Sequence, residues 1–125
     1  IYNICRGGTE MATEINVTGE VVTAYLSGEL DHHTAREMRE TVDNAVELNM
    51  PTLLVLDFGG ITFMDSSGIG LVMGRYRKLV KTGAQLHITG ASPQIARVFK
   101  LAGIERLARL EGDIQPVKTE RRVKR

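Results

Sequence analysis

Two short polar segments carry the side chains that could take part in chemistry. The first is Asp65-Ser66-Ser67-Gly68, which follows the apolar residues 61–64 and precedes a stretch of helical periodicity. A serine at the start of a helix can cap the free amides of the first turn, or its hydroxyl can remain accessible to another protein. Because the positive end of the helix dipole favours anions, a phosphate on Ser66 would leave that helix intact. It would add a charge of about −2 beside Asp65.

The glycines that follow bear on the choice between these two roles. Gly68 and Gly70 lie in the first predicted helical turn, where each costs about 1 kcal/mol relative to alanine. Either close packing of the backbone on a sheet or close approach of a partner can offset this cost. Gly74 continues the small face, which favours packing as part of the explanation. The sequence leaves both explanations open.

The second polar segment, residues 28–34, places one aspartate and two histidines before another predicted helix. A hydrolase triad of Ser66, Asp31 and His32 or His33 has little support. No Gly-x-Ser-x-Gly elbow surrounds the serine, and nothing in the sequence places a histidine within hydrogen-bond reach of it. We therefore expect a protein that is not an enzyme.

Metal and nucleotide sites are not expected either. His32 and His33 are adjacent and should point apart, His87 is isolated in a predicted strand, and no cysteine or spaced carboxylate accompanies them. We expect one of the paired histidines to cap the helix or pack near it. The glycine pairs do not fit a phosphate-binding loop, and no lysine follows them. The sequence therefore predicts no metal ion and no cofactor.

The elements that position these segments follow from the hydrophobic pattern. Residues 14–17 and 21–26 predict a β-hairpin. Residues 52–56 form an unbroken apolar run, which is typical of a central strand covered on both faces, and Gly59-Gly60 should break it. Residues 85–89 and 107–110 predict two further strands.

Three predicted helices separate these strands, because apolar residues recur at helical spacing. Their stripes are Ala35, Met38, Val42, Ala45 and Val46; Ile69, Val72, Met73, Tyr76, Leu79 and Val80; and Ile95, Val98, Phe99 and Ala102. The order ββαβαβαβ predicts a single α/β domain with a mixed central β-sheet. In such folds functional groups gather where parallel strands end and helices begin.

Composition and charge fit a small cytoplasmic domain. The 125 residues are 42% hydrophobic and 25% charged, with a formal net charge of +1 that gives no global field for nucleic acid. Cys5 is the only cysteine, and no apolar run approaches the length of a membrane span. We expect residues 1–12 to be a flexible or non-native N-terminal extension, residues 13–112 the folded domain, and residues 113–125 a basic C-terminal tail.

A family resemblance extends from about Glu14 to Leu110. The motifs GELDHHTA at residues 28–35 and FMDSSGIG at residues 63–70, followed by Gly74-Arg75-Tyr76, closely resemble the sporulation anti-sigma F factor antagonists of the STAS domain family. The resemblance implies a STAS domain that binds an anti-sigma factor serine kinase carrying ATP or ADP and thereby releases a sigma factor. It also implies that this kinase phosphorylates Ser66 and that a separate serine phosphatase removes the phosphate. Nucleotide then enters only through the partner.

The resemblance also implies a partner-binding surface around the two polar segments, with Asp31 near the kinase. The expected contact residues are Gly28, Glu29, Asp31, His33, Thr34, Asp65, Ser66, Ser67, Gly68, Ile69 and Arg75. An alternative keeps the fold and changes the role to a STAS module of a general-stress, stressosome-type regulator. The motif at residues 28–35 favours the sporulation type.

Overall fold

The computed structural model describes residues 13–110. These residues form one sheet of five strands, three α-helices and a short 3-10 helix. The elements are β1 (Thr13–Thr18), β2 (Val21–Leu30), α1 (His32–Asn49), β3 (Leu53–Met64), α2 (Ser67–Val80), β4 (Gln85–Thr89), α3 (Pro93–Leu101), η1 (Ile104–Arg106) and β5 (Arg109–Leu110). The predicted order ββαβαβαβ is confirmed, and the predicted extension and tail lie outside the described residues. No helix in the described range is both long and apolar enough to cross a bilayer.

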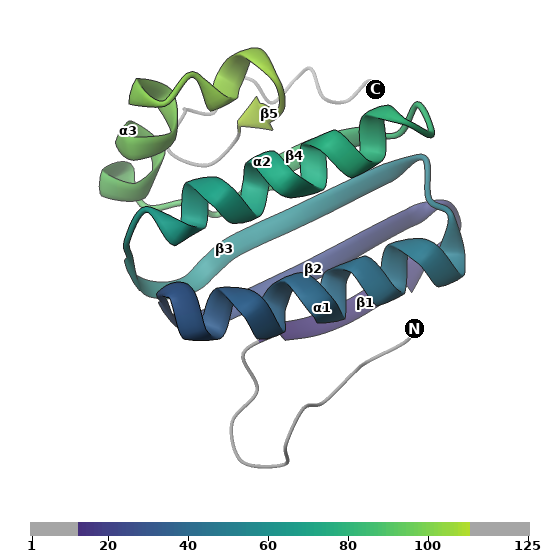
Figure 1. Ribbon diagram of the computed structural model, residues 1–125, viewed down its shortest axis with the longest axis horizontal. Coiled ribbons are helices and arrows are strands. Elements are labelled where there is room, and N and C mark those ends of the chain that lie inside the picture. The colour runs from purple at the N-terminus through teal and green to yellow at the C-terminus, as the bar shows by residue number, and fades with distance from the viewer. Residues whose placement is uncertain (1–12, 111–125) are drawn as a thin grey trace.

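The sheet is mixed, as the sequence predicts. Its strands lie in the order β1-β2-β3-β4-β5, so each strand pairs with its neighbours in sequence. β1 and β2 form an antiparallel hairpin, while β2, β3, β4 and β5 run parallel to one another. The parallel arrangement requires the connecting helices to cross back over the sheet. Consequently α1 and α2 both begin at the edge where β2 and β3 end (Figure 1).

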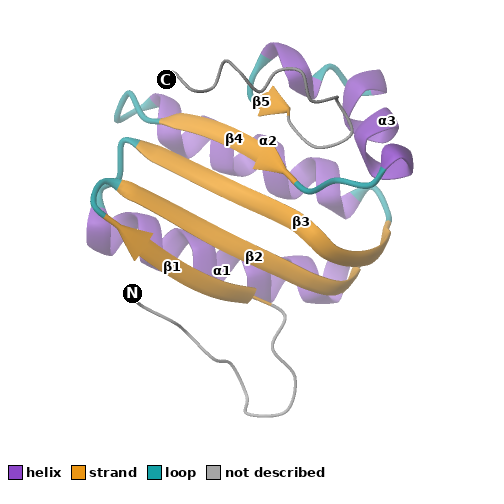
Figure 2. Ribbon diagram, turned by 180° about the vertical axis from the view of Figure 1, so that it is seen from behind, coloured by secondary structure: helices purple, strands orange, loops and turns teal. Residues whose placement is uncertain are grey.

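The prediction that the apolar strand is covered on both faces is wrong for the described residues. α1 and α2 lie over one face of the sheet, and the view from behind shows no described helix over the other (Figure 2). Leu54 and Leu56 on the helix side are fully buried, whereas Leu53 and Val55 on the open side are half-buried. Cross-strand neighbours such as Thr23, which pairs with Val55, flank the open-side residues instead of a second helical layer.

The glycine pair does not end the strand. β3 continues through Gly59-Gly60 to Met64, and β2 continues beside it to Leu30. A Cβ on Gly60 would lie 2.8 Å from the Cβ of Ser27, so glycine allows the two backbones to approach closely here. The pairing of β2 with β3 shifts register at this point. The glycines therefore bend a continuous strand rather than break it.

The helices bury the predicted apolar stripes except at three exposed positions, Val80, Val98 and Ala102. Met38, Val42 and Ala45 of α1 are fully buried against the sheet. Phe99 of α3 packs edge-on against Phe58 of β3, with ring centroids 5.2 Å apart. Val98, predicted to share that face, is instead 37% exposed.

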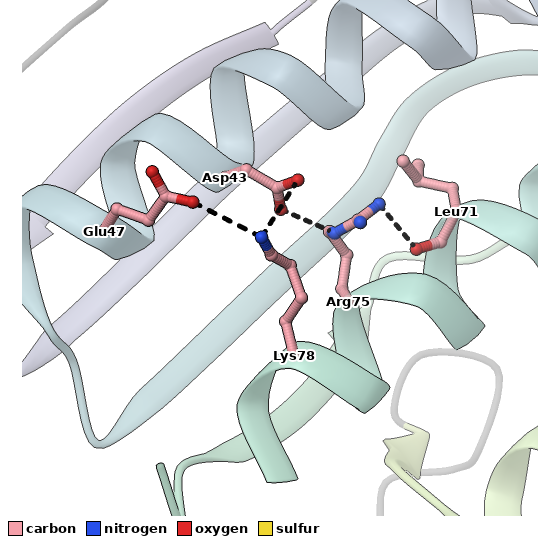
Figure 3. A network of polar contacts seen from close by, with 5 residues as sticks. All are labelled: Asp43, Glu47, Leu71, Arg75 and Lys78. Carbon is pink, nitrogen blue, oxygen red and sulfur yellow. Dashed lines mark hydrogen bonds and ion pairs between the residues drawn. The ribbon is translucent and has the colours of Figure 1, made fainter. Parts of the chain in front are cut away.

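An ion-pair network joins α1 to α2 (Figure 3). The Nε of Arg75 lies 2.8 Å from Oδ1 of Asp43, and its Nη1 donates a hydrogen bond to the carbonyl of Leu71 at 3.3 Å. Lys78 Nζ extends the network to Oδ2 of Asp43 at 3.9 Å and to Oε2 of Glu47 at 3.3 Å. The Arg75 side chain is only 6% exposed, whereas that of Lys78 is 43% exposed. Asp43–Arg75 is therefore the buried ion pair of the network, and the buried charge of Arg75 depends on Asp43 for its neutralisation.

We expect Asp43→Ala to lower the free energy of unfolding by about 2 kcal/mol, because it leaves the buried Arg75 guanidinium without its carboxylate. Urea denaturation monitored by circular dichroism measures the change. Lys78→Ala is the matched control, since removal of an exposed partner costs less than about 1 kcal/mol. Equal losses in the two variants would show that the buried pair does not hold the helices together.

Candidate functional site

The two polar segments lie side by side because the strands that lead to them are paired. Leu30, at the end of β2, is the ladder partner of Met64, at the end of β3. The amide of Asp65 then donates a hydrogen bond of 3.1 Å to the carbonyl of Leu30. The starts of α1 and α2, which are 35 residues apart in sequence by the positions of His32 and Ser67, consequently form one surface.

A capping box fixes the start of α1. Oδ1 of Asp31 accepts hydrogen bonds from the amides of His33 at 2.9 Å and Thr34 at 3.0 Å. In return, the amide of Asp31 donates to Oγ1 of Thr34 at 3.0 Å, and this hydroxyl donates to the carbonyl of Glu29 at 2.7 Å. Asp31 and Thr34 therefore hold the segment between β2 and α1 in one conformation.

Part of this segment is strand and not loop. The strand predicted from the sequence ends at residue 26, whereas Gly28, Glu29 and Leu30 continue β2. Gly28 has a φ of +88°, a conformation that favours glycine. Gly28 and Glu29 are exposed, while Leu30 is fully buried. The connection proper is therefore Asp31 alone.

The capping hydrogen bonds lower the pKa of Asp31. The amide of Thr34 makes the largest contribution, and the amide of His33 adds to it, against the opposing effect of burial. The carboxylate is consequently held in its charged form. Oδ2 makes no hydrogen bond within residues 13–110, so this oxygen is available to a partner while Oδ1 caps the helix.

Ser66 is exposed, and its hydroxyl makes no hydrogen bond within residues 13–110. It occupies the cap position of α2, but its side chain makes no capping hydrogen bond. Its backbone carbonyl accepts instead from the amides of Ile69 at 3.1 Å and Gly70 at 3.3 Å. The side-chain cap comes from Asp65, whose Oδ1 accepts from the amide of Ser67 at 2.7 Å. Asp65 therefore takes the capping role, and the hydroxyl of Ser66 does not.

The glycines of α2 fall into two classes. Gly68 is buried, and a Cβ at this position would overlap the Met64 side chain, so packing explains it. A Cβ at Gly70 or Gly74 would meet no atom of the described residues within 4 Å. Packing therefore accounts for one of the three, and the cost of the other two has no explanation within the fold.

An aromatic side chain that the sequence pattern did not indicate also lies at this surface. Phe63 belongs to the apolar segment before Asp65, yet it is 52% exposed. It pairs across the ladder with Glu29, just after the second shift of register between β2 and β3. Exposed aromatic residues are common anchors of protein interfaces. The strand pattern alone could not reveal this exposure, because the register shifts change which face each residue occupies.

The remaining predicted residues divide between surface and interior. His33 is exposed, and Ile69 is half-buried in the first turn of α2. The rings of His32 and His33 lie 4.3 Å apart, so the expectation that they point apart is wrong. Arg75 lies farther along α2, is 5% exposed and pairs with Asp43. Its burial leaves little of the guanidinium for a partner, and it joins α1 to α2 instead.

The described part of the chain does not assemble a catalytic or metal-binding cluster at Ser66. None of the hydrogen bonds among residues 13–110 joins Ser66 Oγ to a histidine. No group of three metal-ligating side chains occurs in the same range. The arrangement at the start of α2 is therefore an exposed hydroxyl next to the carboxylate of Asp65.

Comparison with known proteins yields one family. The profile of the STAS domain matches residues 12–117. The chain is similar to an anti-sigma F factor antagonist of Lysinibacillus sphaericus, with 38% identity over 88 residues that cover 70% of this chain and 75% of that protein. It is 30% identical to an anti-sigma-B factor antagonist of Staphylococcus aureus over 82 residues, covering 66% of this chain and 75% of that one.

Solved structures give the same result. The chain is similar to the anti-sigma factor antagonist SpoIIAA in its unphosphorylated form, with a TM-score of 0.72, 32% identity and coverage of 90% of this chain and 96% of that one. It is also similar to the Bacillus cell fate determinant SpoIIAA in the phosphorylated form, with a TM-score of 0.67, 32% identity and coverage of 90% and 99%.

We expect Asp31→Ala to lower the melting temperature above pH 4 and to lose this effect in acid. The folded state lowers the pKa of Asp31 from its ordinary value of 3.8. The charged cap therefore stabilises the fold at pH values above 3.8, and this contribution disappears as pH falls through the lower folded pKa. Thermal melts of both proteins across this range measure the difference. Asp31→Asn, which keeps a capping oxygen without a charge, should not show the pH-dependent step.

We expect Gly68→Ala and Gly70→Ala to change stability in opposite directions. Gly68→Ala should lower the free energy of unfolding by about 1–3 kcal/mol, because Met64 must leave its position. Gly70→Ala should raise it by about 1 kcal/mol, because alanine favours the helix and meets no neighbour. Chemical denaturation of the two variants measures both effects. Destabilisation by Gly70→Ala would mean that this position also serves packing.

Proposed function

The chain belongs to the STAS domain family, and on this premise we propose that it is an anti-sigma factor antagonist that phosphorylation of Ser66 switches off. The single observation that carries the proposal is the exposed hydroxyl of Ser66 at the start of α2, free of any capping role. Its partner would be an anti-sigma factor that is also a serine kinase. Binding to this kinase in the cytoplasm would release the sigma factor.

The geometry of Ser66 suits a phosphoryl acceptor. Its oxygen would form a bond to the γ-phosphorus of the ATP held by the kinase, the bond to the leaving ADP would break, and the hydroxyl proton would pass to a base of the kinase. The carboxylate of the adjacent Asp65 is already engaged with the amide of Ser67. The substrate therefore contributes a presented hydroxyl, and the kinase contributes nucleotide and catalysis.

Phosphorylation at this position would change the surface and preserve the fold. The hydroxyl holds no hydrogen bond whose loss would open α2, and the helix start favours an anion. The same phosphate would place a charge of about −2 beside Asp65 and within the surface shared with α1. Repulsion and steric bulk would then prevent docking of the kinase. A serine phosphatase would reverse the change.

The docking surface would comprise the exposed parts of the two helix starts. Gly28, Glu29, His33 and Thr34 would contribute from the β2–α1 side, together with Oδ2 of Asp31. Ser66, Ser67 and Ile69 would contribute from α2, with Asp65 and the buried Gly68 shaping the turn beneath them. Phe63, exposed beside Glu29, extends this set with an aromatic anchor.

A general-stress, stressosome-type regulator is the second candidate, and the 30% identity to an anti-sigma-B factor antagonist favours it. Both candidates use the same fold and a serine at a helix start, so the site geometry does not separate them. The partner does. Co-purification with a small kinase supports the sporulation-type antagonist, whereas recovery in a large multimer supports the stress regulator.

We expect Ser66→Ala to abolish phosphorylation by the kinase and ATP while the variant continues to bind the kinase. Ser66→Asp should weaken binding and change the free energy of unfolding by less than about 1 kcal/mol, because an acid is tolerated at the helix start. Phosphopeptide mapping and isothermal titration calorimetry measure the two effects.

Ser67→Ala is the matched control for this substitution. Its amide, which caps through Asp65, is unchanged, so phosphorylation should proceed as in the wild-type chain. Recovery of phosphate on Ser67 in the Ser66→Ala variant would show that the proposed switch residue, Ser66, is the wrong serine.

A further inference from the structure

A groove of about 370 Å³ runs between α1 and α2, next to the Ser66 surface. Both helices begin at the same edge of the sheet (Figure 1). His32 and Ser67, the first residues of the two helices, both line the groove, so it reaches the two helix starts. Ser67 lines it at that end, Gly70 and Gly74 line the α2 side, and Ala35, Arg36 and Arg39 line the α1 side. The docking residues assigned above do not include Arg36, Arg39, Gly70 or Gly74.

The glycines keep the groove open. Gly70 and Gly74 are four residues apart, so they lie on one face of α2. A Cβ at either position would meet no atom of residues 13–110 within 4 Å, and both glycines line the groove, so a Cβ there would border its open space. Each glycine costs about 1 kcal/mol of helix stability relative to alanine. Because internal packing does not explain these glycines, the remaining explanation is that they leave space for another chain.

The groove is positively charged. Arg36 and Arg39 are exposed and form no ion pair within residues 13–110. Arg75, which also lines the groove, is neutralised by Asp43 (Figure 3). Burial lowers the pKa of Arg75 and the proximity of Arg39 lowers it further, which places these two guanidinium groups within electrostatic range of one another. The positive ends of the two helix dipoles add to the same field.

We propose, building on the function proposed above, that this groove receives an acidic segment of the partner kinase. The two unpaired arginines would recognise its carboxylates, and the glycine face would accommodate its backbone. Arginine suits this role because its planar guanidinium binds carboxylates through two parallel hydrogen bonds. Charge complementarity favours an acidic polypeptide, and the small floor of glycine and alanine favours a segment that lies along the helices.

The groove gives the phosphorylation switch a second physical component. Ser66 precedes Ser67, which lines the mouth of the groove. A phosphate on Ser66 would bring a charge of about −2 to this mouth. It would oppose an incoming acidic segment and would compete with that segment for the arginines. Phosphorylation would therefore act on binding at the groove as well as at the serine itself.

Calorimetric titration of the cognate kinase tests the groove. For the wild-type chain, the dissociation constant should rise between about 0.05 M and about 0.3 M NaCl, because salt screens the arginine–carboxylate attraction. The Arg36→Glu/Arg39→Glu variant should bind about tenfold more weakly at low salt and should lose most of this salt dependence. Arg97→Glu/Arg106→Glu changes the net charge equally at two exposed residues of α3 and η1 and should bind as the wild-type chain does.

Filling the groove provides a test that does not depend on charge. Gly74→Leu should melt no lower than the wild-type chain, because leucine favours the helix and a Cβ at this position meets no described atom within 4 Å, yet it should weaken kinase binding by about tenfold. Asn44→Leu places the same side chain on an exposed position of α1 outside the groove and should leave binding unchanged.

The outcomes separate the groove from the function on which it rests. Wild-type affinity and salt dependence in both groove variants would overturn the groove and leave the Ser66 switch standing. Absence of kinase binding by the wild-type chain would overturn both. A third outcome combines two results: inorganic phosphate displaces the kinase at constant ionic strength, and Gly74→Leu binds the kinase normally. Together they would show that the arginines bind a free anion, and they would overturn the proposal of an acidic segment.

Discussion

The pairing of the last residues of β2 and β3 is the constraint on which the surface depends. Leu30 and Met64 are partners in a parallel ladder, and the amide of Asp65 continues the pairing to the carbonyl of Leu30. Parallel strands must end at the same edge of the sheet, and each is followed here by a helix. The starts of α1 and α2 therefore lie next to one another. Asp31 caps the first of these helices, and Ser66 stands at the start of the second without capping it.

Two aspartates, and not Ser66, cap the helices within this surface. Asp31 and Asp65 accept the amide hydrogen bonds that the two helices require, so both turns are fixed without Ser66. If a serine capped its own helix, phosphorylation would remove a hydrogen bond that the helix start requires. Because Ser66 holds no such bond, a modification there can alter a contact surface while the strand pairing and the helix starts remain intact.

Local patterns predicted the elements well and their environments less well. The helical stripes of α1 and α2 and the mixed α/β order were visible in the spacing of apolar residues. Gly59-Gly60 was read as a break, although close approach to Ser27 makes glycine a requirement of the continuous strand. The apolar run of β3 predicts helices over both faces of the strand, whereas described helices cover one face only (Figure 2) and side chains of the neighbouring strands flank the residues on the other. These errors share one cause, since each depends on what lies across the sheet.

The sequence by itself determined which residues could form the surface. These are two motifs at strand ends, a serine at a helix start, and glycines whose cost in helix stability requires an explanation. These features are local, because caps, helix propensity and periodicity act over a few neighbouring residues. Only the tertiary structure decided which aspartate oxygens are occupied, that Phe63 is exposed, that Arg75 is buried while Arg36 and Arg39 are not, and that Gly68 serves packing while Gly70 and Gly74 border a groove. Those properties arise from contacts between elements, and their register and spacing are fixed when the sheet assembles and the helices pack upon it.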